Sequence, residues 1–477
     1  MASFLGTGTL ADIFFVAFRF PNTFRRIFSE GAFNSAFVPV YTKLIQGDSF
    51  KDAQIFSGNI FLIFLIFTSL LVIIIEIFMP FFIFLIAPGF SSDAEKFSEL
   101  VKVARIIFPF LILLSVSSIY SSILNSNNQF ALTAALPIIL NIVLIISLMI
   151  SYFTSSSFLI FLSWSVIIAG IIQVALLFFS LKILNLHIIY TLKIFASGVG
   201  RFFRLFSVSF FSSGLLQINI LIGTIIASYE SGAISYLYYA DRVYQLPLAL
   251  IGIAIGITLL PSISSKIRSE TSASIHFSIE QTLIFALLFS LPACIGIFML
   301  SELIVSVLFE RGEFDNNSSY LTAKALQYYC LGLVAFILMK IYTPIFFAYE
   351  NARPTIVVTL VNLILNTLLS IILFLKFGFI GIAIATSISA WMSILIMHYY
   401  LNKYNYFKLR LNILYPIIII SIVSFIMYLY LSNLLRYSVN IVNFLFINEI
   451  IFLLFSVLSS ILLYFILISF YKPFNYT

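Results

Sequence analysis

The chain of 477 residues is too apolar for a soluble protein, since 62% of its residues are hydrophobic and only 9% are charged. A soluble domain carries about 25% charged residues and could not bury this much apolar surface. A soluble enzyme, a secreted disulfide scaffold, a disordered chain and a nucleic-acid binder are therefore excluded. The net charge is +7, and the positions of the basic residues are more informative than this sum, because Lys and Arg mark the cytoplasmic face of membrane proteins. The composition predicts an all-α polytopic membrane protein.

Taken in chain order, the apolar runs predict 13 membrane-spanning helices, each with the roughly 20 residues that a bilayer requires. The first covers 8–45 and is expected to break around Pro21. The others are expected at 56–87, 103–124, 130–152, 157–183, 202–227, 234–261, 279–308, 322–348, 355–375, 378–401, 412–434 and 446–470. These runs lack the alternating pattern of barrel strands, which favours helices.

The loop charges predict the orientation. If the loop at 46–55 is cytoplasmic and sides alternate, 13 basic residues lie on that side and six on the other. This ratio follows the positive-inside rule. It predicts a cytoplasmic C-terminus and an N-terminus outside.

Two segments indicate an internal repeat. The first contains FFVAFRFPN and later FVPVYTK, and the second contains YLYYADRVYQLP and later LLPSISSK. Each has an aromatic cluster with an arginine, a proline, an apolar run, and a second proline before a basic end. Duplicated halves are typical of secondary transporters, whose substrate site lies between the repeats.

Charged residues within the predicted spans are costly in a bilayer and are candidate functional residues. The densest cluster contains Asp12, Arg19, Arg25, Arg26 and Glu30. Arg26 and Glu30 are four residues apart and able to pair, whereas Arg25 points about 100° away and is expected to be an uncompensated cation. Asp12 and Arg19 are equally explained as structural charges near the interface.

The second repeat places Arg242 beside Asp241, with Tyr238 and Gln245 on the side of the arginine. For Arg25 and Arg242 we favour substrate binding, and the implied substrate is anionic. Arginine forks bind phosphate oxygens bidentately and keep their charge, so arginines from two halves suit a diphosphate. A proton-coupled drug exporter would more naturally place a lone carboxylate in its cavity.

The segments ADIFFVAFRFPNTFRRIFSEGAFNSAFVP at 11–39, APGFSSDAEKF at 87–97 and YYADRVYQLP at 238–247 closely resemble the MurJ (MviN) lipid II flippase family. ALPIILNI at 135–142, LLPSISS at 259–265, LFERGEF at 308–314 and ENARPT at 350–355 continue the resemblance. It weakens after about residue 405. The family's cavity charges fall on Asp12, Arg25, Arg26, Glu30 and Arg242.

The resemblance implies a two-lobe transporter fold of the MOP superfamily, with lobes at 1–200 and 201–405 and two further helices at 406–477. The implied substrate is lipid II, an undecaprenyl-diphosphate-linked disaccharide-pentapeptide, flipped across the bacterial inner membrane to serve peptidoglycan synthesis. The C-terminal helices would form a groove for the polyprenyl tail. Membrane lipids and cell-wall synthesis enzymes are the other implied partners, and nucleic acid is not one.

Some family members hold a sodium ion, and Asn362 and Asn366, four residues apart, are the candidate ion site here. No cofactor and no metal site are implied, and Na⁺ or the membrane potential is the expected driving force. Family members begin with an additional helix that carries arginines, for 14 spans in all. Because only 13 spans are predicted in this sequence, we expect translation to start about 25 residues upstream, which is the length of one membrane-spanning helix.

Three other functions compete with lipid II transport. A polysaccharide-lipid (O-antigen type) flippase of the same superfamily would also require a cationic cavity, and an inactive truncated paralogue would lack transport. A membrane-embedded glycosyltransferase or phosphatase would require catalytic groups in sizeable external loops. The outer loops offer only short acidic stretches at 93–99 and 310–315, which favours a transporter over an enzyme.

Overall fold

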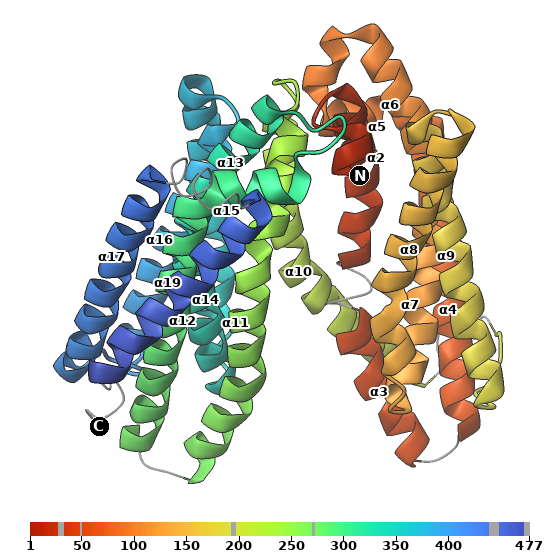
Figure 1. Cartoon of the computed structure of the whole chain (residues 1–477). Coiled ribbons are helices and arrows are strands. Elements are labelled where there is room, and N and C mark those ends of the chain that lie inside the picture. Colours follow the sequence, from red (N-terminus) through yellow and green to blue (C-terminus); the bar gives the residue numbers. More distant parts are fainter. Residues whose placement is uncertain (27–32, 48–49, 192–196, 270–271, 438–447, 472–477) are drawn as a thin grey trace. The chain divides into compact units, whose positions relative to one another are not determined.

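The computed structural model describes residues 1–26, 33–47, 50–191, 197–269, 272–437 and 448–471, and every regular element in these ranges is a helix. Figure 1 labels most of these elements along the chain. The N-terminal helices are α1 (Ala2–Leu5), α2 (Thr9–Arg25), α3 (Phe33–Gly47), α4 (Phe50–Ile77), α5 (Met79–Ile86), η2 (Pro88–Ser92), α6 (Ala94–Ile107), α7 (Phe110–Ser126), α8 (Ala131–Thr154), α9 (Phe158–Ile183) and α10 (Val199–Ala227). They are followed by α11 (Ala233–Ser269), α12 (Ser272–Phe309), α13 (Asn316–Cys330), α14 (Leu333–Ala348), α15 (Arg353–Phe377), α16 (Ile380–Lys403), η3 (Leu411–Ile413), α17 (Leu414–Arg436) and α19 (Glu449–Tyr471).

Within the described ranges, ten helical stretches are long and apolar enough to cross a membrane. They overlap ten of the 13 predicted spans, and the remaining predictions fall on α2 with α3, on α10 and on α11. The span predicted at 56–87 is too long at its end, since α4 ends at Ile77 and α5 is a separate helix after Phe78. Large apolar side chains on these helices face outward, among them Phe67, Leu70 and Ile73 of α4. Outward-facing rows of this kind would be unfavourable in water and are expected against lipid. The all-α polytopic membrane fold predicted from composition is confirmed.

The expected break at Pro21 is wrong. The helix α2 continues through Pro21 to Arg25, and Pro21 is buried in its interior. A proline removes one backbone hydrogen bond and usually kinks a soluble helix. In membrane helices it is tolerated, because neighbouring helices and local adjustments satisfy the freed backbone groups.

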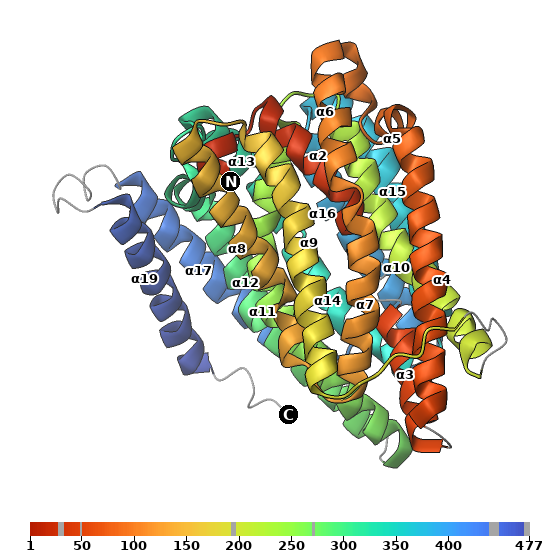
Figure 2. The same ribbon diagram turned by 90° about the vertical axis from the view of Figure 1, so that its right-hand side faces the viewer.

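The chain divides into two compact units, residues 3–234 and 235–477. The lobe boundaries expected at residues 200 and 405 are a different division of the chain and remain predictions. In the first unit, α8 and α9 lie side by side, and α7 contacts both α4 and α9 (Figure 2). Part of its core is aromatic: the ring centroids of Phe33 and Phe64 are 5.1 Å apart, and Phe202 lies against both. This core fixes the position of α3.

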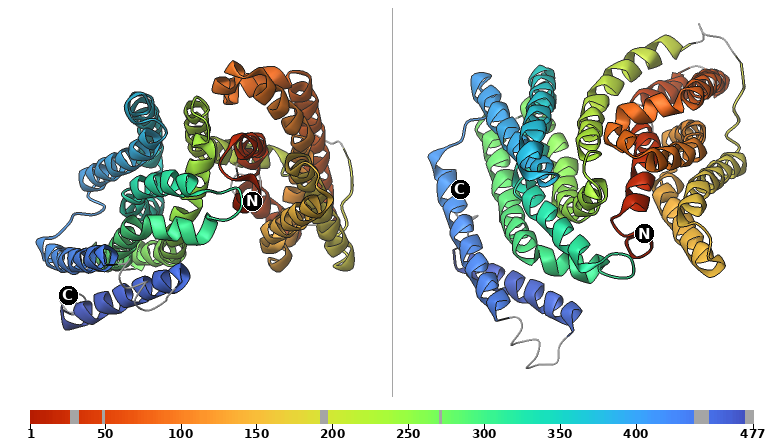
Figure 3. Two further views of the ribbon diagram at one scale, coloured as in Figure 1. Left: turned by 45° about the horizontal axis from the view of Figure 1, so that its top comes forward. Right: turned by 90° about the horizontal axis from the view of Figure 1, so that it is seen from above.

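In the second unit, α12 contacts α13, α14, α17 and α19, and α15 pairs with α16. Figure 3 shows the C-terminal helices α17 and α19, in blue, running side by side. The hydroxyl of Tyr464 on α19 donates a hydrogen bond to the carbonyl of Leu288 on α12 at 2.8 Å. The last two helices are therefore attached to the second unit by buried contacts.

Candidate functional site

The helix α2 carries three of the predicted site residues, Asp12, Arg19 and Arg25, and each has a polar partner. Arg19 donates a hydrogen bond from Nη1 to the hydroxyl of Thr224 on α10. Arg25 donates from Nε to the side-chain oxygen of Asn22, one turn earlier, at 3.0 Å. A neighbouring amide oxygen therefore orients Arg25, and the expectation that its charge is uncompensated remains a prediction. The partner is neutral, so the guanidinium charge is not cancelled by this contact.

Arg26 is half-buried directly after α2, where its backbone N–H donates to the carbonyls of Asn22 and Thr23. The predicted partner of Arg26, Glu30, lies outside the described residues. The Arg26–Glu30 pair therefore remains a prediction.

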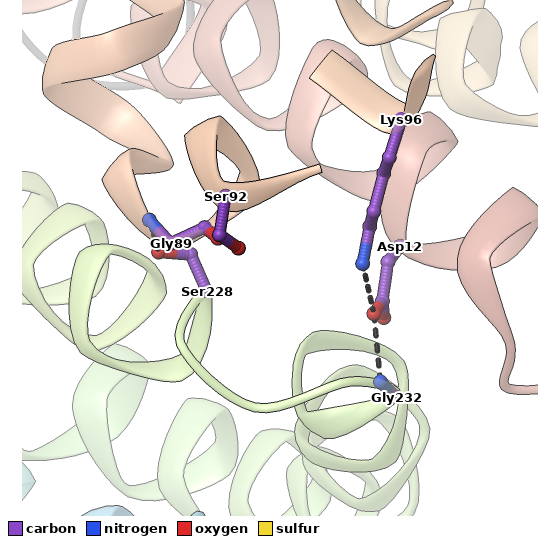
Figure 4. A network of polar contacts seen from close by, with 6 residues as sticks. All are labelled: Asp12, Gly89, Ser92, Lys96, Ser228 and Gly232. Atoms are coloured by element: carbon purple, nitrogen blue, oxygen red, sulfur yellow. Dashed lines mark hydrogen bonds and ion pairs between the residues drawn. The ribbon is translucent and has the colours of Figure 1, made fainter. Parts of the chain in front are cut away.

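Asp12 lies at the centre of a polar network in the first unit (Figure 4). Its side chain is fully buried, and its Oδ2 accepts a hydrogen bond from the backbone N–H of Gly232 at 2.8 Å. The same oxygen lies 3.8 Å from Nζ of Lys96 on α6, whose ammonium also lies 3.7 Å from the ring centroid of Phe90. A buried carboxylate requires such partners, because an unpaired charge is strongly penalised in an apolar environment. We refer to Asp12, Lys96 and Gly232 as the aspartate network.

A close backbone approach accompanies this network. The hydroxyl of Ser228 accepts a hydrogen bond from the backbone N–H of Gly89 at 3.0 Å (Figure 4). A Cβ at Gly89 would lie 2.3 Å from the carbonyl oxygen of Ser228, a distance that no side chain can occupy without backbone movement. Residues 228–232, which follow α10, therefore contact the earlier part of the first unit at Gly89 and at Asp12.

Arg242 lies on α11 and is held differently from the arginines of α2. Its guanidinium carbon lies 4.6 Å from the ring centroid of Tyr238, one turn earlier, as the sequence spacing predicts. Its Nε is buried and has no hydrogen-bond partner within the described part of the chain. Gln245, expected on the side of the arginine, donates instead to the carboxylate of Asp241. Arg242 thus combines a cation–π contact with a buried donor that can take an acceptor.

The predicted ion-site residues lie on α15, against α16. The amide nitrogen of Asn362 donates to the carbonyl of Ser389 at 3.1 Å and to the hydroxyl of Ser393 at 2.8 Å. Asn366 is 5% exposed. The amide nitrogen of Asn362 is thus committed to α16, which orients its side chain, and an ion site here remains a prediction.

Two features of the first unit were not predicted from the sequence, and the first is the pair of contacts made by Lys96 and Gly89. Lys96 and Gly89 belong to the APGFSSDAEKF segment, but nothing in their spacing relates them to Asp12 or Ser228. The second feature is a cleft of about 880 Å³ in the first unit, between α3 and the turn from α7 to α8. The four consecutive polar residues at 125–128 are visible in the sequence, but nothing in the sequence places them against α3.

The fold of this chain is shared with solved membrane proteins. Its structure is similar to that of an inward-facing multidrug resistance MATE family transporter of the MOP superfamily, with a TM-score of 0.73 over 84% of this chain and 92% of the other. At 12% identity this likeness establishes the fold alone. A greater likeness, with a TM-score of 0.84 and 28% identity, is to the inward closed conformation of the lipid II flippase MurJ, covering 99% of this chain and 94% of that one.

The family model "Lipid II flippase MurJ" matches residues 1–464. A probable lipid II flippase MurJ of Rhizobium tropici is 39% identical over 82% of this chain and 74% of its own length. The corresponding protein of Rickettsia prowazekii is 38% identical over 84% and 79%. The chain belongs to the MurJ lipid II flippase family, as its motifs predicted.

Proposed function

We propose that this protein moves lipid II from the cytoplasmic to the periplasmic leaflet of the bacterial inner membrane by alternating access. The observation that carries the proposal is the family match over residues 1–464, together with a likeness to a MurJ structure over almost the whole chain. The candidate site adds arginines suited to an anionic lipid headgroup.

In this proposal the diphosphate is bound by Arg25, Arg26 and Arg242. Arg242 contributes a buried Nε–H that has no hydrogen-bond partner in the described residues, and a phosphate oxygen would satisfy it. Charge-assisted hydrogen bonds to phosphate are stronger than neutral ones. Arg25 contributes a guanidinium that the side-chain oxygen of Asn22 orients, and the fork of N–H donors of a guanidinium suits a phosphate.

Asp12 and Arg19 take supporting roles in the proposal, and Glu30 is proposed to pair with Arg26, four residues earlier in the sequence. The contacts of Asp12 with Lys96 and Gly232 and of Arg19 with Thr224 support a role in positioning α2. These side chains would act on the substrate through the placement of Arg25 and Arg26.

The polyprenyl tail is proposed to lie along α17 and α19. Exposed apolar side chains cover both helices, including Ile418 and Phe425 on α17 and Leu458 and Leu462 on α19. An apolar surface of this kind accommodates isoprenoid chains without any polar contact. A sodium ion at Asn362 and Asn366 is a further proposal, and Na⁺ or the membrane potential would provide the driving force.

Complementation of a MurJ-depleted bacterium tests this function. Expression of the chain should restore growth and cell shape, and a membrane-inserted variant without Arg25 and Arg242 should not. Failure of the well-expressed, correctly inserted wild-type chain to restore growth would contradict the proposal.

A further inference from the structure

The cleft between α3 and the α7–α8 turn has a lining of polar and apolar side chains, and none of the described residues that line it is charged. Its volume of about 880 Å³ is within the range of small-molecule sites, roughly 300–1,000 Å³. Eight of its twelve lining residues carry a hydroxyl or an amide, among them Ser35, Thr42 and Gln46 on α3 and Asn125, Asn127 and Asn128 near the turn, and the other four are Val38, Pro39, Ile45 and Phe130.

The two faces of α3 explain how the cleft forms. Phe33, Phe37 and Tyr41 recur at four-residue spacing and are buried in the aromatic core. Ser35, Thr42 and Gln46 recur at seven- and four-residue spacing on another face and line the cleft. These two spacings each keep side chains on one face of a helix. A polar face is costly against lipid, which favours contact with water or with a polar ligand.

Hydrogen bonds within the protein orient two amides of the lining. Ser122 donates from its hydroxyl to the side-chain oxygen of Asn34 at 2.6 Å. Thr133 donates to the side-chain oxygen of Asn125 at 2.9 Å. Fixing the amides in this way lowers the entropy that they would lose on binding a ligand.

The lining selects for a neutral, hydrogen-bonding ligand. Side-chain amides and hydroxyls donate and accept hydrogen bonds, which matches the hydroxyl and acetamido groups of a sugar. A diphosphate or a peptide carboxylate would lack a cationic partner among the described lining residues. Phe130, 56% exposed at the edge of the cleft, offers an apolar ring against which the C–H face of a pyranose can lie.

We propose that this cleft binds the disaccharide of the transported lipid, while the arginines bind its diphosphate. The inference rests on the proposed function, since it assigns one part of that substrate to one part of the first unit. It predicts that sugar recognition and diphosphate recognition depend on different residues.

The test measures binding of two lipids to the purified full-length protein in nanodiscs. One lipid is undecaprenyl diphosphate, and the other is undecaprenyl diphosphate carrying the disaccharide without peptide. The wild type should bind the disaccharide lipid about tenfold more tightly, the effect of two or three neutral hydrogen bonds. The near-isosteric double variant Thr42→Val/Gln46→Leu should bind both lipids equally, with unchanged affinity for undecaprenyl diphosphate.

A matched control variant removes one side-chain amide and one hydroxyl at a place outside the cleft. Gln281→Leu/Thr282→Val on α12 deletes a half-buried amide and a half-buried hydroxyl of the second unit, and it should keep the tenfold preference. If the double cleft variant does not fold, Thr42→Val and Gln46→Leu singly should each reduce the preference.

The outcomes separate this inference from the proposed function. Retention of the full preference by folded cleft variants, or an equal loss for both lipids, would overturn the sugar assignment while leaving lipid transport intact. A cleft variant that weakens only peptide-bearing lipid would assign the cleft to the peptide and overturn the inference. Wild-type protein that binds neither lipid would contradict the proposed function itself and remove the inference with it.

Discussion

The charged residues of α2 and those of α11 differ in how their neighbours hold them. On α2, Asp12, Arg19 and Arg25 each contact a polar group, and the partners of Asp12 and Arg19 lie on other elements. On α11, Arg242 rests on the ring of Tyr238 and keeps a buried Nε without a hydrogen-bond partner in the described residues. Substitutions on α2 should therefore affect stability and transport together, whereas Arg242 should affect transport alone.

The largest expected effect is on stability, from Asp12→Asn. Removing one partner of a buried ion pair costs about 3–5 kcal/mol, and Lys96 would retain its charge with a side chain only 10% exposed. Thermal unfolding in detergent should show a clear loss of stability.

A double variant sharpens this prediction. Replacing both charges with neutral groups is often close to neutral, so Asp12→Asn/Lys96→Met should be more stable than Asp12→Asn. Equal stability of the single and double variants would show that the Asp12–Lys96 contact contributes little.

The next effect is on substrate binding, from Arg242→Ala. A hydrogen bond to a charged group contributes about 1.5–3 kcal/mol, so affinity for undecaprenyl diphosphate should fall roughly 10- to 150-fold. The unfolding temperature should change little. Arg242→Lys should restore only part of the affinity, because an ammonium cannot donate in the bidentate geometry of a guanidinium. Loss of folding in Arg242→Ala would show that Arg242 is structural, as the α2 charges are.

A smaller effect should come from a helix cap in the second unit. Asp315 precedes α13 and accepts hydrogen bonds from the side chain and the backbone N–H of Ser318, which lower the pKa of its carboxyl. Asp315→Ala should cost about 1 kcal/mol of stability at neutral pH without changing transport. Because the folded-state pKa is lowered, the cap stabilises above the unfolded pKa of about 3.9. The difference from wild type should shrink as pH falls through the lowered pKa, and a difference constant with pH would contradict this.

The smallest effect concerns the support of Arg242. Tyr238→Leu removes the ring below the guanidinium, a contact of about 0.5–1 kcal/mol, and should weaken diphosphate binding roughly two- to fivefold. Tyr238→Phe keeps the ring and should bind as the wild type does. If the phenylalanine variant is as weak as the leucine variant, the hydroxyl rather than the ring supports Arg242.

Much of the fold could be predicted from the sequence because lipid leaves few alternatives. Apolar runs of sufficient length must form helices, and ten described stretches lie where the sequence placed them. The contact of Arg242 with Tyr238 was equally accessible, since residues four apart share a helix face. The spacing of residues along the chain was therefore sufficient to predict both the helices and this contact.

The aspartate network and the cleft could not be predicted in this way. Asp12 accepts from a backbone N–H 220 residues later, and a backbone group leaves no mark in the side-chain pattern. The course of α2 through Pro21 depends on tertiary packing that overrides the local preference of proline. The neutral face of α3 is visible in the sequence, but the turn that completes the cleft lies about 80 residues later.

The most direct test of the central claim is transport of fluorescent lipid II by proteoliposomes containing wild type, Arg25→Ala or Arg242→Ala. We expect wild-type protein to move the lipid across the bilayer, and each folded alanine variant to lose at least about nine-tenths of that rate, the effect of one charge-assisted hydrogen bond. Arg242→Ala should do so at wild-type stability. Wild-type rates from both variants would contradict the claim that these arginines bind the diphosphate during transport.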